Sequence, residues 1–383
     1  MTQLKPTSEF GQCRVLVVED NPVNRQLVAA MLEIMGIRQI IEAKDGEEGL
    51  ERLAEAMPDL IILDIMMPRM DGFEFLTRLR ADPAYAEIPV LVATALSESH
   101  ERARAFDAGA SDYVVKPMDR REFVARASVH LRTRLLVGNL RQYQDRLSRD
   151  LASAHAMQQA LLPSPDRIAE IETTYGVKLA SVFRSSDELG GDLWDIIAID
   201  DNRFAVYMAD FTGHGIAAAI NTFRLHMMMA RKEELAADPA ALLERVNQTL
   251  LKVLQRGQFA TMAHAVFHMK EGHVTLSMAG APPPIRRAAN GIGEMIAEHS
   301  HPLGMIAATT YRSIQIPFHP GDAILLYSDG LSEATDSSGN LLGEEPVRYL
   351  AERCSGDLNG EVQALRLAGW SFEDDLTMVW VSR

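Results

Sequence analysis

Between residues 14 and 131 the chain alternates short apolar runs with amphipathic stretches, and this alternation constrains the fold most. Apolar runs such as RVLVVED (14–20) and DLIILD (59–64) predict buried strands, and PVNRQLVAAMLEIMG (22–36) predicts a helix that ends at Gly36. Further strands are predicted at 39–43, 88–95 and 112–116, and further helices at 46–57, 71–81, 98–109 and 119–131. Strand–helix units repeated in this way predict an α/β fold with a doubly wound, five-stranded parallel sheet.

Polar side chains stand where the predicted strands end. Glu19 and Asp20 end the first strand, Asp64 the third, Thr94 the fourth and Lys116 the fifth. Ligands of doubly wound sheets bind at the carboxyl ends of the strands, so these side chains are expected to converge. Carboxylates suit Mg²⁺, Asp64 is then placed as a nucleophile for a phosphoryl group, and Lys116 and Thr94 can contact its oxygens. The alternative, unrelated acids solvated at strand ends, leaves the coincidence of these positions unexplained.

Residues 12–135 resemble the CheY-like receiver domain of response regulators. The matching motifs are VVED, LDIMMPRMDG, ATA and VVKP. The resemblance implies that Asp64 accepts a phosphoryl group from a sensor histidine kinase or a phosphotransfer protein, and that Thr94 and Tyr113 occupy switch positions. The Mg²⁺ ligands that it implies are Glu19, Asp20, Asp64 and the backbone carbonyl of Met66.

Residues 119–162 contain no proline and a single glycine, Gly138, which favours a long helix. Spacings that alternate between four and three residues predict a coiled coil of about three to four heptads, through which the chain forms a parallel homodimer. Its apolar positions are Leu136, Leu140, Tyr143, Leu147, Ala154, Met157 and Leu161, with Asp150 as a polar residue in the seam. The alternative is an amphipathic helix packed on its own domain. We place this connector at 136–163, and we hypothesise that Asp150 weakens it so that phosphorylation can change its pairing.

Residues 164–383 are predicted to form an α+β domain with antiparallel sheets and helices packed outside them. Two helices are predicted, at 215–235 and 238–255. Strands are predicted at 177–186, 193–200, 203–211, 263–269, 273–280, 311–318, 323–330 and 376–383.

Acids again mark the strand boundaries of this domain. Asp192 follows two glycines in ELGGDLWDI, Asp210 precedes FTGHG, Asp329 precedes Gly330, and Asp374 and Asp375 precede the last strand. Such acids, if gathered, repel one another unless cations compensate them, and oxygen ligands suit two Mg²⁺ or Mn²⁺ ions. The double glycine and acid also allow a nucleotide cyclase of the GGDEF kind. That reading lacks its acidic–aromatic pair, because Leu193 and Trp194 follow, and it leaves the later acids unexplained.

Residues 155–383 resemble the metal-dependent protein phosphatase (PPM) family, in its SpoIIE-like bacterial branch. The motifs occur in the family's order: QQALLP, LGGDLWD, ADFTGHG, FATM, AGAPPPI, LYSDGLSEATD and EDDLTMVWV. The resemblance implies a four-layer sandwich and hydrolysis of phosphoserine or phosphothreonine in one step, without a phospho-enzyme. The metal ligands that it implies are Asp192, Asp210, Asp329, Asp374 and the backbone carbonyl of Phe211. Ala281 replaces the family's usual histidine, which puts substrate contacts in doubt rather than catalysis, and Ser328 stands where threonine is commoner.

Other polar residues are weaker candidates. Arg184 suits a substrate phosphate, although a solvated arginine is an equal alternative. His214 is a possible general acid, or only part of a glycine-flanked turn. Asp195, Glu333 and Asp375 are candidates for orienting the metal ligands.

Charge and cysteine usage narrow the class of protein. A net charge of −15 argues against a nucleic-acid partner. Cys13 and Cys354 have no metal-ligand spacing, and there is no signal-peptide pattern. No uncharged apolar run approaches ~20 residues, so we expect a soluble cytoplasmic protein without membrane contact.

The expected function is a two-component response regulator whose phosphatase acts on a phosphoserine protein, in this branch often an anti-sigma-factor antagonist in a partner-switching pathway. The alternative is a receiver-gated adaptor whose phosphatase-like domain is catalytically silent.

Overall fold

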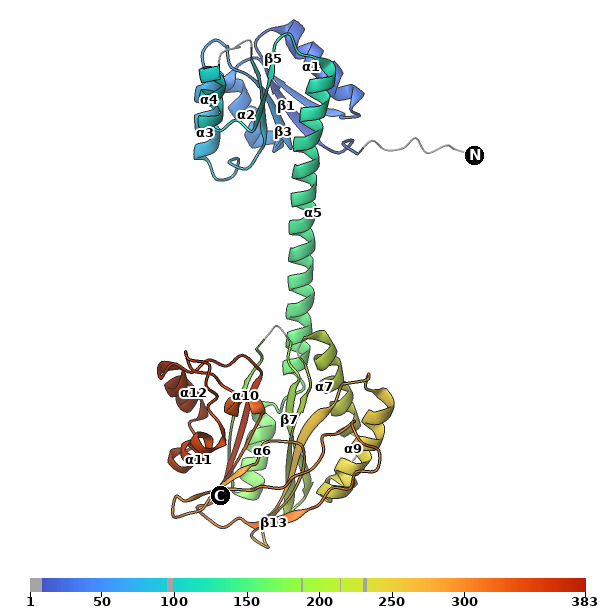
Figure 1. The fold of residues 1–383 in the computed structure, drawn as a ribbon, viewed down its shortest axis with the longest axis vertical. Helices are drawn as coiled ribbons and strands as arrows, with labels where there is room; N and C mark the ends of the chain where they lie inside the picture. Colours follow the sequence, from blue (N-terminus) through green and yellow to red (C-terminus); the bar gives the residue numbers. More distant parts are fainter. Residues whose placement is uncertain (1–8, 95–98, 187–188, 214, 230–232) are drawn as a thin grey trace, which may run out of the picture. The chain divides into compact units, whose positions relative to one another are not determined.

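The chain forms two compact units in the computed structural model, Met1–Arg146 and Leu147–Arg383, and each is described by itself. The structure describes residues 9–94, 99–186, 189–213, 215–229 and 233–383 (Figure 1). Helix α5 (Arg120–Gln159) begins in the first unit and ends in the second.

The first unit contains a five-stranded sheet in the order β2-β1-β3-β4-β5, with every pair parallel, which confirms the predicted fold. Its strands are β1 (Arg14–Val18), β2 (Gln39–Ala43), β3 (Leu60–Asp64), β4 (Val90–Thr94) and β5 (Asp112–Val115). Its other helices are α1 (Pro22–Ile34), α2 (Gly46–Ala56), α3 (Gly72–Ala81) and α4 (Ser99–Asp107). The strand order reverses between β1 and β3, and ligands of such sheets bind at the carboxyl ends of the strands at this point.

Both faces of this sheet are covered by apolar helix faces. Val28 of α1 and Phe123 of α5 belong to the core on one face, whereas Leu53 of α2 and Phe75 of α3 belong to the core on the other. Side-chain caps begin the helices directly after the loops that follow the strands; for example, Asn21 accepts a hydrogen bond from the amide of Val23 at 2.9 Å. The strand-end side chains therefore extend from a rigid, doubly covered sheet.

Helix α5 contains the predicted last receiver helix at 119–131 and continues into the connector, as the lack of proline in 119–162 indicated. Most of the predicted seam is exposed, with Leu136 at 62%, Leu140 at 57%, Tyr143 at 67% and Leu147 at 43%. Such exposure does not fit a helix packed on its own domain by this face. The boundaries drawn at 135 and 163 stay predictions. Within the described residues, no helix is both long and apolar enough to cross a membrane.

The second unit contains two antiparallel five-stranded sheets. The first has the order β13-β10-β9-β8-β7 and the second the order β12-β11-β14-β15-β6. The strands are β6 (Lys178–Arg184), β7 (Asp192–Asp200), β8 (Arg203–Phe211), β9 (Ala260–His268), β10 (His273–Ala279), β11 (Ile285–Arg287), β12 (Gly293–Met295), β13 (Ile314–Pro317), β14 (Ala323–Tyr327) and β15 (Leu376–Ser382). The helices are α6 (Pro165–Tyr175), α7 (Ile216–Met229), α8 (Glu233–Ala236), α9 (Pro239–Val253), α10 (Asp329–Ser332), α11 (Glu344–Arg353) and α12 (Leu358–Leu367).

Three apolar cores separate four layers in this unit, as the family resemblance implied. One core lies between the two sheets, and includes Phe204 of β8 and Val379 of β15. A second joins the β7–β8 sheet to α7 and α9, and a third joins the β14–β15 sheet to α11 and α12. In Figure 1 these helix pairs lie on opposite outer sides of the unit. The sequence did not predict α6, α11, α12 or the short strands β11 and β12, and residues 230–232 of the predicted helix 215–235 lie outside the described residues.

Candidate functional sites

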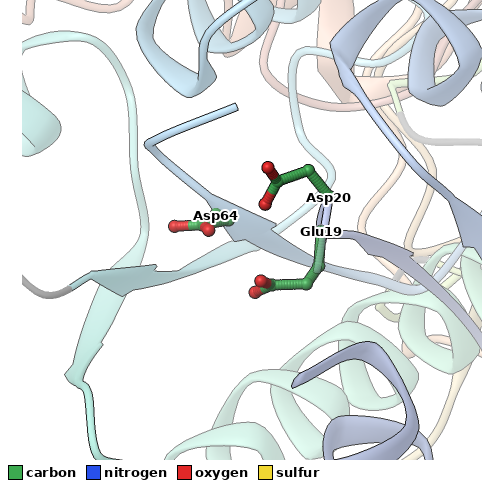
Figure 2. Close-up of side chains that lie close together, drawn as sticks. All are labelled: Glu19, Asp20 and Asp64. Atoms are coloured by element: carbon green, nitrogen blue, oxygen red, sulfur yellow. The ribbon is translucent and has the colours of Figure 1, made fainter. Parts of the chain in front are cut away.

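The first candidate site lies at the carboxyl ends of β1 and β3. These strands are neighbours, with Val18 opposite Leu63, so the residues that follow them meet at one edge. Figure 2 shows the carboxylates of Glu19, Asp20 and Asp64 close together, and one oxygen from each lies within 4.8 Å of the others. Glu19 and Asp64 are buried and Asp20 is exposed. Three converging carboxylates fit a hard divalent cation such as Mg²⁺.

Lys116 extends from the end of β5 into the same group. Its Nζ lies 2.8 Å from Glu19 Oε2 and 2.8 Å from Asp64 Oδ2. Burial by itself lowers the pKa of Lys116, but the hydrogen bonds to both carboxylates outweigh it and raise that pKa. Burial raises the pKa of Asp64 and the Glu19 charge adds to this rise, although Lys116 opposes it. Among the described residues, Lys116 is the cation that contacts these carboxylates, and a divalent cation would balance the remaining negative charge.

The two predicted switch residues lie on adjacent strands. Thr94 is the last residue of β4 and is buried. The half-buried Tyr113 lies on β5, and its hydroxyl accepts a hydrogen bond of 2.9 Å from Arg102 Nη1. The ring of Phe106 packs edge-on against Tyr113, with centroids 5.9 Å apart. Contacts from α4 therefore hold the Tyr113 ring in its observed position.

Two residues that the sequence did not single out hold Glu19. Asn24 Nδ2 donates to Glu19 Oε1 at 2.9 Å, and Arg25 Nη1 donates to the Glu19 carbonyl at 2.7 Å. The backbone amide of Met66 lies 3.4 Å from Asp64 Oδ1, which places Met66 directly beside the predicted phosphoacceptor. No local pattern marks Asn24 or Arg25, since both lie on the ordinary amphipathic helix α1.

The second candidate site joins the two sheets of the second unit. Asp192 begins β7 and Asp210 lies opposite it on β8. Asp329 begins α10 directly after β14, and Asp374 precedes β15, which pairs with β14. Thr377 Oγ1 on β15 donates to Asp192 Oδ2 at 2.5 Å and so connects one sheet to the other. Acids separated by more than 180 positions thus belong to one site.

The acids of the second site are poorly compensated by the protein itself. Burial raises the pKa of Asp192 to about 8, although the Thr377 hydroxyl opposes this, and the charges of Asp375 and Asp329 raise it further. Burial also raises the pKa of Asp210 to about 9, with added repulsion from Asp192, Asp329, Asp374 and Asp375. Within the described part of the chain, the Oδ1 atom of Asp192 is buried without a hydrogen-bond partner. This unpartnered oxygen among mutually repelling acids fits a divalent cation.

The acids of the second site lie less close together than those of the first. Within the described residues, only Glu19, Asp20 and Asp64 bring three acids within 4.8 Å of one another. Asp192 is buried, Asp210 and Asp329 are half-buried, and Asp374 is exposed. The donor chemistry of the second site therefore fits cations, whereas its spacing is wider than that of the receiver site.

The glycines before Asp192 permit close backbone approach. A Cβ on Gly191 would lie 2.4 Å from the Phe211 carbonyl oxygen and 3.0 Å from Asp210 Oδ1. A Cβ on Gly190 would lie 2.3 Å from Asp375 Oδ2. Neither position has room for a side chain, so the double glycine is required by packing next to the acids.

Asp374 and Asp375 have different environments. Asp375 is buried and accepts hydrogen bonds from the amides of Gly191 at 2.5 Å and Ser186 at 2.8 Å. Asp374 is exposed, which leaves its carboxylate available to a ligand. Ser328 Oγ accepts from the Thr377 amide at 2.9 Å and so fixes the adjoining strand. Asp375 therefore holds the backbone of Ser186 and Gly191, and its orienting role stays a prediction.

The remaining predicted residues of the second unit have different contacts. Arg184 donates to Asn359 at 3.3 Å. Asp195 is buried, and its Oδ1 accepts a hydrogen bond of 2.9 Å from Arg167 Nη1. The sequence did not predict this partner. Glu333 shares with Asp329 and Ala281 the lining of a cavity of about 350 Å³. His214 lies outside the described residues.

Comparison with known proteins agrees with both units. The family model for the response regulator receiver domain matches residues 15–128, and the model for Stage II sporulation protein E (SpoIIE) matches residues 200–383. The regulator RpaA of Synechocystis sp. is 42% identical over 119 residues, which are 31% of this chain and 49% of that protein. PhoB of Escherichia coli is 40% identical over 119 residues, which are 31% of this chain and 52% of that protein. The chain thus covers about half the length of these curated relatives.

Among solved structures, the SiaA-PP2C domain of Pseudomonas aeruginosa has a similar fold, with a TM-score of 0.54 and 20% identity. The similarity covers 63% of this chain and 98% of that one. The two matched stretches lie in the two compact units of the chain. The chain joins a response regulator receiver domain, matched over residues 15–128, to a domain of the SpoIIE family, matched over residues 200–383.

Proposed function

We propose that phosphorylation of Asp64 controls a metal-dependent phosphoserine or phosphothreonine protein phosphatase in the second unit. The observation that carries this proposal is the pairing of Asp192 with Asp210 across β7 and β8, with a buried Asp192 oxygen that has no hydrogen-bond partner among the residues that the structure describes. A structural acid in such a position is expected to be hydrogen-bonded, because an unpaired buried charge is costly.

The second unit's own residues would orient the phosphatase site. Asp192, Asp210, Asp329, Asp374 and the Phe211 carbonyl would hold two Mn²⁺ or Mg²⁺ ions. When bound, these ions would activate a water nucleophile and offset charge on the phosphoryl oxygens. Thr377 fixes one oxygen of Asp192, and Asp375 fixes the amide of Gly191. These contacts limit the movement of the ligands, and so favour in-line displacement at phosphorus.

In the receiver unit, a carboxylate oxygen of Asp64 would attack the phosphorus of a phosphohistidine on a sensor kinase or phosphotransfer protein. The new bond gives an aspartyl phosphate, and the histidine nitrogen leaves. A Mg²⁺ held by Glu19, Asp20, Asp64 and the Met66 carbonyl would neutralise the transferred group. Lys116, already 2.8 Å from Asp64, would pair with a phosphoryl oxygen, and Thr94 would hydrogen-bond another.

The connector is the proposed route between the two units. Its seam residues Leu136, Leu140, Tyr143 and Leu147 are exposed on a single helix. A second copy of this helix would cover them in a parallel coiled coil, and Asp150 would weaken the seam locally. Phosphorylation of Asp64 would then change the pairing of the helices and the alignment of the phosphatase site.

The proposed substrate is a small phosphoserine protein, and an anti-sigma-factor antagonist is the class that the SpoIIE resemblance implies. A net charge of −15 disfavours a nucleic-acid partner. Together with a kinase partner, this composition would suit a cytoplasmic protein.

The test is Mn²⁺-dependent hydrolysis of a phosphoserine protein by the full chain and by Asp210→Asn. We expect Asp210→Asn to lower the rate about 100-fold, because a metal site supplies several kcal/mol of transition-state stabilisation. Asp201→Asn is the matched control, since Asp201 is an exposed acid on the turn between β7 and β8. A wild-type chain without activity, whether or not Asp64 is phosphorylated, would overturn the proposal.

That negative result would favour the alternative function, a receiver-gated adaptor that only holds a partner. The wider spacing of the acids in the second unit is the observation on its side. An adaptor would bind its phosphoprotein partner equally well as wild type and as Asp210→Asn, with no phosphate released by either.

A further inference from the structure

Gln158 is an unusual residue of α5. Its neighbours Met157 and Gln159 are exposed, yet the polar side chain of Gln158 is 1% exposed. Burying an amide is unfavourable unless both its N–H and its C=O groups find partners. The position of Gln158 therefore requires specific contacts at the end of the helix.

Those contacts are made with the glycine segment of the second candidate site. Gln158 Nε2 donates to the Gly190 carbonyl at 2.7 Å, and the Gly190 amide donates to Gln158 Oε1 at 3.2 Å. The same Nε2 lies 3.4 Å from Thr222 Oγ1 on α7, the helix that follows the Asp210 loop. One side chain thus joins α5, the Gly190 segment and α7.

The segment Gly190–Gly191 has no side chains, so only hydrogen bonds to its backbone can fix its position. The Gly191 amide donates to Asp375, and its carbonyl accepts from the Phe211 amide at 3.1 Å. Gly190, one residue earlier, is held on both of its hydrogen-bonding groups by Gln158. Removing the Gln158 amide would free the backbone that leads directly into Asp192.

We propose that Gln158 is a positioning residue, through which the end of α5 holds the Gly190–Gly191 segment, and with it Asp192, in a cation-binding geometry. The inference rests on the proposed function, because it assigns Asp192 to a metal site. It also names the contact through which the connector would act on the second site, the hydrogen bonds between Gln158 and Gly190. Helix α5 runs from Arg120 to Gln159, so a shift of its last turn moves the Gln158 amide relative to Gly190.

The test compares Mn²⁺ binding by the full chain carrying Gln158→Met with binding by its parent, using the EPR signal of free Mn²⁺. All variants also carry Asp20→Asn and Asp64→Asn, so that the receiver site does not contribute. Methionine keeps the length of the side chain and removes both hydrogen bonds. We expect Mn²⁺ binding about 10- to 100-fold weaker, the usual effect of removing a group that orients metal ligands.

Two further variants sharpen the result. Gln159→Met is the matched control, because Gln159 is exposed and its Nε2 contacts His155 at 2.9 Å, so its Mn²⁺ affinity should equal that of the parent. Gln158→Glu keeps an acceptor for the Gly190 amide and loses the donor to its carbonyl, so its affinity should be intermediate. In phosphatase assays, kcat at limiting Mn²⁺ should fall and recover at saturating Mn²⁺, with KM for the phosphoprotein unchanged.

Parental Mn²⁺ affinity in both Gln158 variants would overturn the inference. Thermal unfolding is measured alongside, and if Gln158→Met does not fold, Gln158→Glu decides by the same comparison. Mn²⁺ binding by the parent without any hydrolysis would overturn the proposed phosphatase instead, and would leave the comparison of affinities valid. A parent that binds no Mn²⁺ would overturn both.

Discussion

At the scale of residues, Gly190 and Gly191 set how closely the backbone approaches the acids of the second unit. The double glycine is visible in the sequence, but the atoms that exclude a side chain come from β8 and from the loop before β15. The four acids predicted as ligands were also visible there, and their assignment as ligands stays a prediction. Asp375 was a candidate from the sequence, but its hydrogen-bond partners were not predicted. Thr377 and Gln158 were missed, because hydrogen bonds to distant groups leave no local pattern.

Gly191→Ala should damage the second site. The added Cβ would lie 2.4 Å from the Phe211 carbonyl, a backbone atom that cannot move alone. We expect a loss of stability of about 1–3 kcal/mol, typical of overpacking, together with weaker Mn²⁺ binding. Chemical unfolding measures the change in stability, and the EPR signal of free Mn²⁺ measures the change in binding.

Gly138→Ala is the control, since its Cβ would meet nothing within 4 Å and should stabilise α5 by about 0.5–1 kcal/mol. Unchanged Mn²⁺ binding in Gly191→Ala would contradict the assigned packing.

At the scale of elements, α5 shows what periodicity can and cannot predict. The absence of proline and the regular apolar spacing correctly indicated a helix through residues 136–159. The connector continues directly from the last receiver helix, as the absence of proline between 119 and 162 indicated. Leu140 and Tyr143 are exposed, which favours pairing with a second helix over packing on the same domain, and the pairing itself stays a prediction.

A cysteine at Leu147 should report the proposed pairing. In a parallel coiled coil the same seam position faces itself across the dimer, so Leu147→Cys should form an intermolecular disulfide under mild oxidation. Gln144→Cys, exposed and off the seam, should cross-link poorly, and the native Cys13 and Cys354 are both buried. Non-reducing electrophoresis and light scattering measure the product. Equal cross-linking of both variants, or a monomer in solution, would refute the parallel pairing.

At the scale of the whole molecule, one continuous helix begins in the unit that holds the candidate receiver site and ends in the unit that holds the second acid-rich site. The receiver site is built at the switch point of a parallel sheet, and the second site spans two antiparallel sheets. Control of one by the other needs an element common to both units, and α5 is the element that begins in the first and ends in the second.

Treatment with beryllofluoride, which mimics an aspartyl phosphate, should change the rate of phosphoserine hydrolysis by the wild-type chain. Asp64→Asn should abolish this response, because the mimic needs the Asp64 carboxylate beside Lys116. Asp107→Asn, an exposed acid at the end of α4, should respond as the wild type does. Rates measured with and without beryllofluoride, at fixed Mn²⁺, provide the comparison. A full response in Asp64→Asn would refute control through this residue.

Local sequence patterns predicted the five parallel strands of the first unit, the longer strands of the second unit and the strand-end positions of the acids. These features depend on local periodicity and on residue types at element ends, which neighbouring residues reveal. The hydrogen-bond partners that position these acids and the glycines beside them follow only from the packing of the folded chain. Asp375 reaches the Gly191 amide across 184 positions, and Gln158 reaches Gly190 across 32. Their partners are backbone groups, which every residue carries, so only the packing of sheets and helices selects the ones that meet.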